Sequence, residues 1–401
     1  MKEFISVDEA ESIIAAHVRT MSAEFVSLDS SYGRTLSGSI LSEHDIPPFD
    51  NSAMDGFAVR ASEVDTVPVE LSVSQEIRAG GFPRDSLLGG TCARILTGAP
   101  IPSGADAVVP VEWTEGDDPV RFLRSPSVGH AIRLAGEDVA AGHMIFSGGE
   151  TVTPPVIGML AAVGCSDVPV SVRPACSIIA TGDELVRHDR QPERGQIRNS
   201  NGPALVAQVV SAGGRVAREL TARDNPSSLN ECLTASLGND LVILSGGVSV
   251  GAYDHVKDVL DNLGVRLLFW KVKQRPGKPL VFGVRGETLV FGLPGNPVSS
   301  SICFDRYVRT TIARMLGRST VERHRRIATL AESMTKVRGL QYFARGYLRY
   351  SDDNALLVVP TGPQGSGIHS SIAHADCIIH LPEEMENPEP GVSVEVEPLT
   401  W

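Results

Sequence analysis

Apolar residues in the middle of the chain occur in short unbroken runs that alternate with stretches of helical spacing. Unbroken runs are typical of parallel strands covered on both faces. The strand-like runs are residues 176–180, 216–220, 241–244 and 288–291. The stretches with helical spacing are residues 203–212, 229–237 and 256–263, with Gly264 as the stop. This alternation predicts a doubly wound parallel α/β domain over residues 173–317.

On either side of this region the apolar pattern changes. Residues 59–139 contain short β-like runs separated by glycine- and proline-bearing turns, and shorter alternating runs return after Gly317. A capping box at Ser6–Glu9 and a Thr153-Pro start each predict a packing helix. We therefore expect four units: a helical linker domain (1–45 with 140–172), a β-rich domain (46–139), the α/β domain (173–317) and a C-terminal β-barrel or β-sandwich (318–401).

Composition excludes several classes of protein. The formal net charge is −12 and no basic stripe is present, which argues against nucleic-acid binding. No apolar run approaches the roughly 20 residues of a membrane span, and the N-terminus lacks a signal-peptide core. The six cysteines are scattered, with no Cys-x-x-Cys pair, as expected in a reducing compartment. These features predict a cytoplasmic protein that binds neither membrane nor nucleic acid.

A glycine-rich loop follows the apolar run 241–244. Its candidate ligand contacts are Ser245, Gly246, Gly247, Ser249 and Gly251. Such a strand–loop–helix arrangement places free backbone N–H groups at the carboxyl edge of a sheet, where phosphates and other anions bind. A βα turn that needs glycine only for packing fits the spacing equally well.

Acidic residues follow several of the predicted strands. Glu184 comes after strand 176–180, Asp224 after strand 216–220, and Asp254 near the start of the helix beyond the glycine loop. Carboxylates that converge beside an anion-binding loop suggest Mg²⁺, which usually bridges carboxylates to substrate phosphates. Upstream, Glu137 and Asp138 follow a glycine, and either ligate a metal or form a solvated turn.

Two further polar groups are candidates for binding. Lys271, Lys273, Arg275 and Lys278 fall within eight residues around Pro276-Gly277. They form either a solvated hairpin or an oxyanion pocket. Asp50, Asn51, Ser52 and Asp55 crowd beside large apolar residues, which favours a binding role over a simple turn, whereas Thr97 gives only a weak signal. No nucleophile with an adjacent base is evident.

Eight stretches in a fixed order resemble the molybdopterin molybdenumtransferase family, which includes bacterial MoeA and the E domain of gephyrin. They are residues 47–59, 96–102, 136–138, 181–185, 195–201, 245–251, 276–279 and 293–299, and they span nearly the whole chain. The resemblance implies an L-shaped homodimer of four-domain chains, with an α/β domain like that of molybdopterin adenylyltransferases. It implies that adenylylated molybdopterin and molybdate react with Mg²⁺ to release AMP and form molybdenum cofactor.

By motif position, the resemblance also assigns roles to residues. The catalytic acids would be Glu184, Asp254, Asp224 and Asp138, with Glu184, Asp224 and Asp254 as metal ligands. Substrate would contact the glycine loop and Asp55, Thr97, Lys271, Arg275, Lys278, Pro294, Asn296, Arg345 and Ser371, the last two in a molybdate pocket. A molybdopterin adenylyltransferase is a candidate partner.

The chain departs from the family pattern at several positions. Arg275 replaces a usual lysine, Asn199 a frequent aspartate and Phe57 a frequent tyrosine, while His369 and His374 are unusual and are interpreted as surface or packing residues. Two rival functions remain open at this point. One is a gephyrin-like scaffold that binds receptors, and the other is a molybdopterin adenylyltransferase. The extra terminal domains argue against the second, and the intact acids and basic turn argue against the first.

Overall fold

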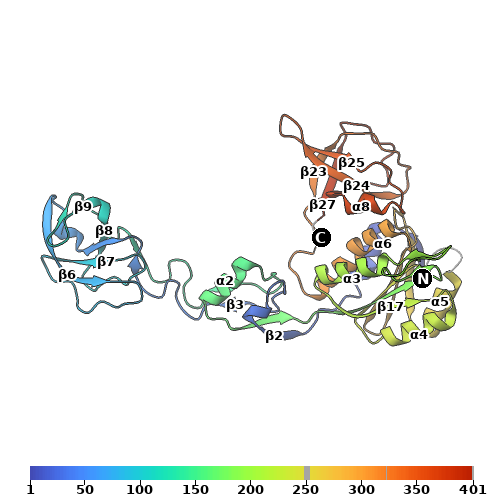
Figure 1. Ribbon diagram of the computed structural model, residues 1–401, viewed down its shortest axis with the longest axis horizontal. Helices are drawn as coiled ribbons and strands as arrows, with labels where there is room; N and C mark the ends of the chain where they lie inside the picture. Colours follow the sequence, from blue (N-terminus) through green and yellow to red (C-terminus); the bar gives the residue numbers. More distant parts are fainter. Residues whose placement is uncertain (248–252, 322, 400–401) are drawn as a thin grey trace.

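The molecule is elongated, with its units arranged in a row. The computed structural model describes residues 1–247, 253–321 and 323–399. A β-rich unit occupies one end, a narrow unit lies in the middle, and an α/β unit that carries a small barrel forms the other end (Figure 1). Within these described residues no helix has the length and apolar character that crossing a membrane requires.

The α/β unit is built on a seven-stranded sheet with the order β1-β19-β21-β22-β18-β14-β17. Its strands are β1 (Lys2–Ile5), β14 (Ala175–Thr181), β17 (Arg215–Ala222), β18 (Leu241–Ser245), β19 (Arg266–Val272), β21 (Val281–Arg285) and β22 (Thr288–Leu293). The predicted parallel sheet is confirmed for the neighbours β17, β14, β18 and β22. By contrast, β21 is antiparallel to both neighbours, because it joins β22 through a two-residue hairpin turn that allows no crossover.

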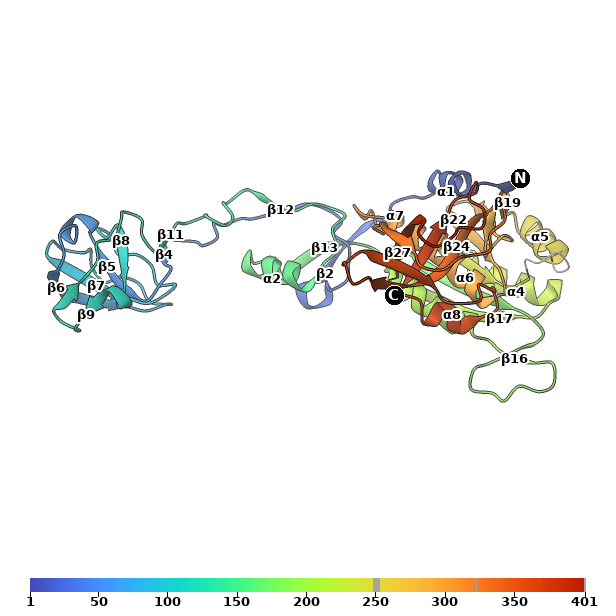
Figure 2. The ribbon, with the colours of Figure 1, turned by 90° about the horizontal axis from the view of Figure 1, so that it is seen from above.

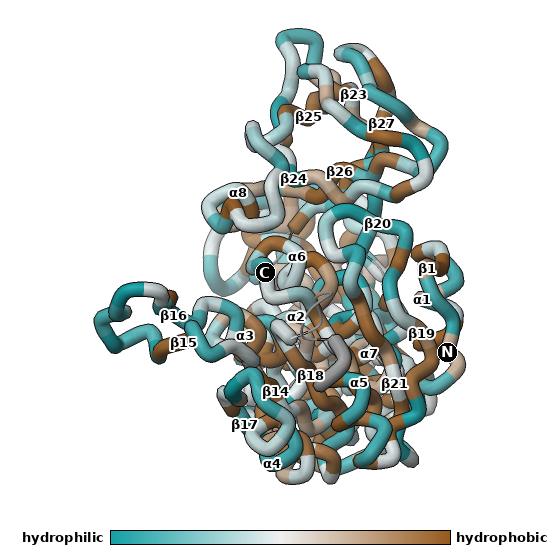
Figure 3. Tube along the Cα trace, turned by 90° about the vertical axis from the view of Figure 1, so that its right-hand side faces the viewer, coloured by the Kyte–Doolittle hydropathy of each residue, from teal (hydrophilic) through white to brown (hydrophobic). Residues whose placement is uncertain are grey.

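Helices cover both faces of this sheet. The first face carries α1 (Val7–Ala15), α3 (Asn201–Ala212), α6 (Pro297–Cys303) and α7 (Arg309–Met315), whereas α4 (Pro226–Ser236) and α5 (Tyr253–Asn262) cover the second. A π-helical turn, η4 (Phe304–Val308), joins α6 to α7. Figure 3 shows apolar residues concentrated on the central strands β14 and β18 and polar residues on the projecting loop between β15 (Leu185–Val186) and β16 (Ile197–Arg198).

The N-terminal residues differ from the expected linker assignment. β1 pairs with β19 and forms one edge of the seven-stranded sheet, and Ile5, Val7 and Ile14 are buried in the same core as the central strands. Residues 2–15 therefore extend the α/β unit, since their apolar stripe covers the edge and face of its sheet. The middle unit is also less helical than predicted. It contains α2 (Pro154–Ala162) and the pairs β2 (Ala23–Ser27) with β13 (Asp167–Ser171) and β3 (Ile40–Leu41) with β12 (Met144–Phe146).

The C-terminal residues form the predicted barrel. Its strands are β23 (Arg326–Leu330), β24 (Gln341–Tyr350), β25 (Leu356–Pro360), β26 (Cys377–Leu381) and β27 (Ser393–Pro398). The order β24-β25-β23-β27-β26 closes through pairing of β26 with β24, which removes the free edges. A short strand from the α/β unit, β20 (Gln274–Arg275), pairs with the start of β24. The barrel is thus fixed to the α/β unit at β20, and its helix α8 (His369–Ala373) lies against α6.

The β-rich unit is a six-stranded sheet far from the barrel (Figure 2). Its order is β8-β5-β7-β6-β10-β9. The strands are β5 (Gly56–Val59), β6 (Val69–Ile77), β7 (Thr91–Ile95), β8 (Ala107–Pro110), β9 (Thr114–Glu115) and β10 (Val120–Phe122). The short pair β4 (Asn51–Ser52) and β11 (Ile132–Arg133) connects this sheet to the middle unit.

Candidate functional site

A large cleft lies at the carboxyl ends of strands β14, β18 and β22. Its volume is about 630 Å³. It is lined by Ala180, Thr181, Glu184, Leu185, Ile197, Arg198, Asn199, Ser200, Asn201, Asp224, Ser245, Gly246, Gly247, Pro279, Pro294, Gly295, Asn296, Pro297, Gly367 and His369. The carboxyl edge of parallel strands is where open α/β sheets bind ligands. Seven of the residues predicted from sequence therefore meet in one place: Glu184, Asp224, Ser245, Gly246, Gly247, Pro294 and Asn296.

The glycine loop serves packing as well as lining the cleft. Gly246 and Gly247 have φ angles of +92° and +67°, which favour glycine. A Cβ atom on Gly246 would lie 2.5 Å from the carbonyl oxygen of Thr181. The packing explanation is thus correct for these two glycines, and it does not exclude ligand binding by their backbone. Ser249 and Gly251 lie outside the described residues.

Two polar side chains hold the loop against its neighbours. The side-chain amide of Asn201 donates to Ser245 Oγ at 2.9 Å and to the carbonyl of Gly295 at 2.8 Å. Asn199, which replaces the aspartate frequent in the family, accepts a hydrogen bond from the Gly202 N–H at 2.9 Å. Its side chain therefore stabilises the first turn of α3. The hydroxyl of Thr181 is buried beside the loop without a partner among the described residues, and so remains available to a bound group.

The cleft carboxylates are Glu184 and Asp224, and both are exposed. The Asp224 N–H donates to Asp183 Oδ1 at 3.2 Å, which ties the loop after β17 to the loop after β14. The part of the chain that the structure describes contains no group of three or more histidine, cysteine or acidic side chains that could enclose a metal ion. Asp254 is the second residue of α5, but its side chain is outside the described residues. Two exposed carboxylates still suit Mg²⁺, which takes one or two protein ligands when substrate phosphates supply others.

The basic turn adjoins the cleft without lining it. Pro279 is part of the lining, whereas Lys271, Arg275 and Lys278 are not. Arg275 and Lys278 are exposed, and each lies over an aromatic ring: Arg275 over Tyr342 at 5.3 Å and Lys278 over Phe4 at 4.8 Å. The turn is therefore an ordered cationic surface on the edge of the cleft.

Arg345 on β24 and Ser371 on α8 are brought together on the outer side of the barrel. Arg345 is fully buried, and its Nε donates to Ser371 Oγ at 3.1 Å. The rest of its guanidinium donates to the carbonyls of Gln364 and Gly365, which shapes the loop that reaches the cleft. Burial, and then the positive charge of Arg275, lower the pKa of Arg345 to about 10. Two neighbouring cations that destabilise each other form a site that an anion would stabilise.

The same barrel loop closes one side of the cleft. Asn296 donates to Ser366 Oγ at 3.0 Å, and Gly367 and His369 line the cleft. His369 and His374 are both exposed, in agreement with their interpretation as surface or packing residues, but the position of His369 in the cleft lining was not predicted. Nothing in the sequence around His369 indicated this position, because the barrel loop reaches the cleft only through tertiary packing. Asn201 and Arg198 were also missed, although both lie within the recognised stretch 195–201.

The remaining predicted residues lie in other units. The backbone N–H and hydroxyl of Thr97 donate to Asp55 Oδ1 at 2.7 and 2.8 Å, and both hydrogen bonds lower the pKa of Asp55. Asp138 is exposed where the middle and β-rich units meet. Within one chain, the β-rich unit that contains Asp55 and Thr97 is at the opposite end of the molecule from the α/β unit (Figures 1 and 2).

Comparisons with known proteins cover nearly the whole chain. Residues 5–164 match the MoeA N-terminal region (domain I and II), residues 177–314 a probable molybdopterin binding domain, and residues 328–399 the MoeA C-terminal region (domain IV). The chain is 37% identical to molybdopterin molybdenumtransferase 2 of Mycobacterium tuberculosis over 98% of this chain and 100% of that protein. It is 34% identical to molybdopterin molybdenumtransferase of Bacillus subtilis over 98% and 93% of the two chains.

Solved structures agree with the sequence relatives. The crystal structure of a molybdopterin biosynthesis MoeA protein from Pyrococcus horikoshii OT3 has a TM-score of 0.85 and 29% identity, covering 99% of this chain and 100% of that one. A second MoeA structure from Pyrococcus has a TM-score of 0.84 and 30% identity, over 99% and 100% of the two chains.

Proposed function

This chain belongs to the molybdopterin molybdenumtransferase family and is an enzyme of molybdenum cofactor biosynthesis, and from that premise we propose how its cleft carries out the reaction. The substrates are adenylylated molybdopterin and molybdate. Attack by water on the phosphoanhydride of the adenylylated pterin would release AMP and leave the terminal phosphate on the pterin, which then leaves carrying molybdenum. One observation carries this proposal: Glu184 and Asp224 share a cleft with the glycine loop and Asn296.

Each part of the cleft has a distinct task in this proposal. The N–H groups of the glycine loop and the buried Thr181 hydroxyl hold phosphate oxygens. Glu184 and Asp224 would hold Mg²⁺, together with Asp254 from the start of α5. When bound, Mg²⁺ offsets the charge that develops on the phosphate oxygens. Asn296 and the barrel loop restrict the other side of the cleft, so that the adenylylated end of the substrate is oriented toward the carboxylates.

Molybdate would bind beside this cleft, at the basic turn. Lys271, Arg275 and Lys278 offer positive charge in a chain of net charge −12. Arg345, buried nearby with a lowered pKa, adds to a local surplus of positive charge that suits a dianion. A tetrahedral oxyanion is held best by several donors at once.

We also propose that the functional protein is a homodimer in which Asp55, Thr97 and Asp138 of one copy complete the cleft of the other. The elongated shape supports this arrangement, because within a single chain the β-rich unit lies at the opposite end from the α/β unit (Figure 1). The free thiols of all six cysteines support a cytoplasmic location. A molybdopterin adenylyltransferase that delivers the substrate would be its natural partner.

The proposal is tested by AMP release from adenylylated molybdopterin with Mg²⁺ and molybdate. We expect Glu184→Gln to slow AMP release by roughly 100-fold, the scale for loss of a preorganised electrostatic group. Binding of the adenylylated pterin should change far less, because the glycine loop is intact. Asp352→Asn removes an exposed carboxylate of the barrel and serves as the matched control. Equal turnover in the parent and Glu184→Gln would show that the carboxylates of this cleft do not promote the reaction.

A further inference from the structure

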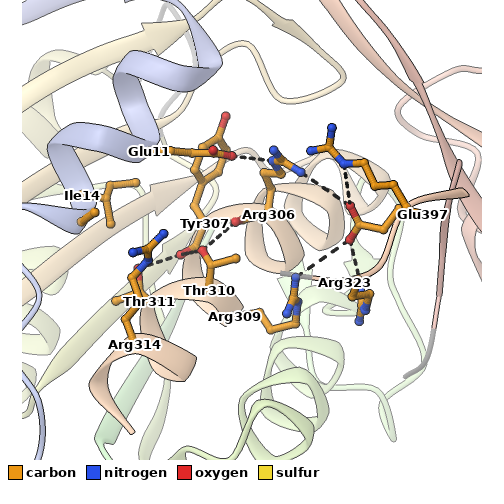
Figure 4. A pocket seen from close by; sticks show the side chains of 12 residues that line it. Glu11, Ile14, Arg306, Tyr307, Arg309, Thr310, Thr311, Arg314, Arg323 and Glu397 are labelled. Carbon is orange, nitrogen blue, oxygen red and sulfur yellow. Dashed lines mark hydrogen bonds and ion pairs between the residues drawn. The ribbon is translucent and has the colours of Figure 1, made fainter. Parts of the chain in front are cut away.

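The long helix that ends the α/β unit contains one irregular turn. α6 passes into the π-helical turn Phe304–Val308 before α7 begins. Turns of this kind insert an extra residue into a helix and are frequent at functional sites. Here Arg306 reaches Glu11 at 2.6 Å and Glu397 at 3.6 Å, while the adjacent Tyr307 extends on the Glu11 side of the helix (Figure 4). Adjacent residues of a helix point in different directions, and here Arg306 and Tyr307 accordingly have different partners.

Tyr307 begins a chain of buried hydrogen bonds that ends at the basic turn. It is 1% exposed, and its hydroxyl donates to the side-chain oxygen of Gln274. Gln274 is also fully buried, and its side-chain amide donates to the carbonyl of Gly277 at 3.1 Å. Because burial raises the pKa of Tyr307, this hydroxyl keeps its proton at neutral pH and remains a donor.

The backbone at Gly277 fits closely against this relay. Its φ angle is +92°, and a Cβ atom there would lie 2.4 Å from Cys303 Sγ and 2.7 Å from the side-chain nitrogen of Gln274. Cys303 Sγ also lies 3.7 Å from the Gly277 carbonyl oxygen. The turn is therefore held from inside by residues of α6 and of the π-helical turn.

The outer side of the same turn carries the cations. Successive residues of a strand point to opposite sides, and β20 shows this alternation: Gln274 is buried and Arg275 is exposed. Arg275 Nη1 donates to the Tyr342 hydroxyl at 3.2 Å, and Lys278 lies over the Phe4 ring. Any change in the backbone between Gln274 and Lys278 would alter the separation of these two cations.

We propose that Tyr307 and Gln274 are positioning residues for the oxyanion-binding turn, which fix the separation of Arg275 and Lys278 through the carbonyl of Gly277. The inference rests on the proposed role of this turn in molybdate binding. The new element is that two buried residues, which do not touch the substrate, also determine molybdate binding. Substitutions of these two residues should weaken the affinity for molybdate and leave the affinity for adenylylated pterin unchanged. The reason is that the glycine loop makes no contact with Tyr307 or Gln274 among the described residues.

Tyr307→Phe tests this inference because it removes only the hydroxyl. We expect the molybdate concentration for half-maximal AMP release to rise about three- to tenfold, the factor that corresponds to loss of one hydrogen bond. The rate at saturating molybdate and the affinity for adenylylated pterin should stay within about twofold of the parent. Gln274→Met removes both bonds of the relay at similar volume and should give the same shift, with no further change in the double variant.

Thr311→Val is the matched control. Thr311 is fully buried in the same helix, and its hydroxyl donates to the Tyr307 carbonyl at 2.7 Å without reaching the turn. It should lower the free energy of unfolding as Tyr307→Phe does and leave the molybdate titration unchanged. If Lys278→Ala shifts the titration and neither Tyr307→Phe nor Gln274→Met does, the positioning role is refuted and the molybdate role of the turn stands. If none of the three shifts it, the turn is not the molybdate contact.

Discussion

Charged side chains around the cleft differ in how much their present contacts constrain them. Arg345 is fully buried, and its guanidinium already donates to Ser371 and to two carbonyls. Lys278 is exposed and touches only the face of Phe4 among its described contacts. Lys278 can therefore move onto an arriving anion at little cost, whereas Arg345 contributes a fixed charge.

This difference makes Lys278 the sharpest single-residue test of molybdate binding. We expect Lys278→Ala to raise the half-saturating molybdate concentration at least about tenfold, because bound molybdate would bury its contact with the ammonium group, and removing one member of a buried charge pair costs a few kcal/mol of binding free energy. Affinity for adenylylated pterin should shift less. Lys2→Ala removes an exposed charge from the neighbouring strand β1 and controls for net charge. A Lys278→Ala titration curve that overlays the parent curve would show that this turn is solvated surface and does not bind molybdate.

Arg275, the departure from the family lysine, also has a local explanation. Its planar guanidinium lies over Tyr342 and donates to the hydroxyl of that residue, a pairing that a compact ammonium group forms less well. Arg275→Lys retains the charge but weakens this pairing. The substitution should therefore change how precisely the side chain is positioned in the turn, while the charge of the turn stays the same.

Among the elements, the last barrel strand and the helix through the π-helical turn form an ionic contact between the barrel and the α/β unit. Glu397 on β27 is buried, at 3.6 to 4.0 Å from Arg306, Arg309, Arg323 and Arg325 (Figure 4). A further partner is His380 at 3.1 Å. Burial alone would raise the pKa of Glu397, but the His380 hydrogen bond and the arginines outweigh it and lower the pKa to about 2.

This depressed pKa predicts how stability depends on pH. In the unfolded chain Glu397 titrates near 4.5, so the stability it provides is complete above that pH and is lost as the pH falls from 4.5 toward 2. The loss amounts to about 3 kcal/mol. Burial also lowers the pKa of His380, which adds a loss in the same direction below pH 6.5.

Glu397→Gln should therefore be less stable at neutral pH by about 3 to 5 kcal/mol, because it leaves buried arginines without their carboxylate. Its stability should also fall less steeply than that of the parent between pH 5 and pH 3. Urea unfolding at a series of pH values measures both effects. Glu395→Gln on the same strand removes a half-exposed partner of Arg325 and should cost no more than about 1 kcal/mol. Parallel pH curves for Glu397→Gln and the parent would contradict this account.

At the scale of the whole molecule, the elongated shape separates two halves of the predicted site. Asp55 and Thr97 are hydrogen-bonded to each other in the β-rich unit, while Glu184 and Asp224 lie in the α/β cleft. A two-fold dimer that places the β-rich unit of one copy over the cleft of the other would join them. Two inactive chains with defects in opposite halves should then complement each other.

We expect an equal mixture of Asp55→Ala and Glu184→Gln chains, after subunit exchange, to recover about a quarter of parent activity. Half of the dimers would be hybrids, and each hybrid would have one intact site of two. Mixing Asp55→Ala with Thr97→Val provides the control, since both defects fall in the same half and no site is restored. AMP release before and after exchange measures the effect. A fully active monomer on a sizing column would rule out the shared site.

Local patterns in the sequence were enough to predict the α/β sheet edge that carries the site, the family and the C-terminal β unit. The apolar runs and the glycine loop placed Glu184, Asp224 and Ser245 at one sheet edge, because the ends of parallel strands meet there by geometry alone. The ordered motifs identified the family, since each requires particular residues within a few positions. The short alternating strands predicted a C-terminal β-barrel or β-sandwich, and the pairing of β26 with β24 decided for the closed barrel.

Only the tertiary structure decided contacts between residues distant in sequence. It placed β1 in the α/β sheet, put His369 in the cleft wall, buried Arg345, and joined Tyr307 to Gln274. It also left the β-rich unit, which contains Asp55, far from the α/β unit within one chain. Periodicity reports which face of an element is apolar, but not which other element covers that face. These placements therefore depend on how whole elements pack, and no local pattern in the chain encodes them.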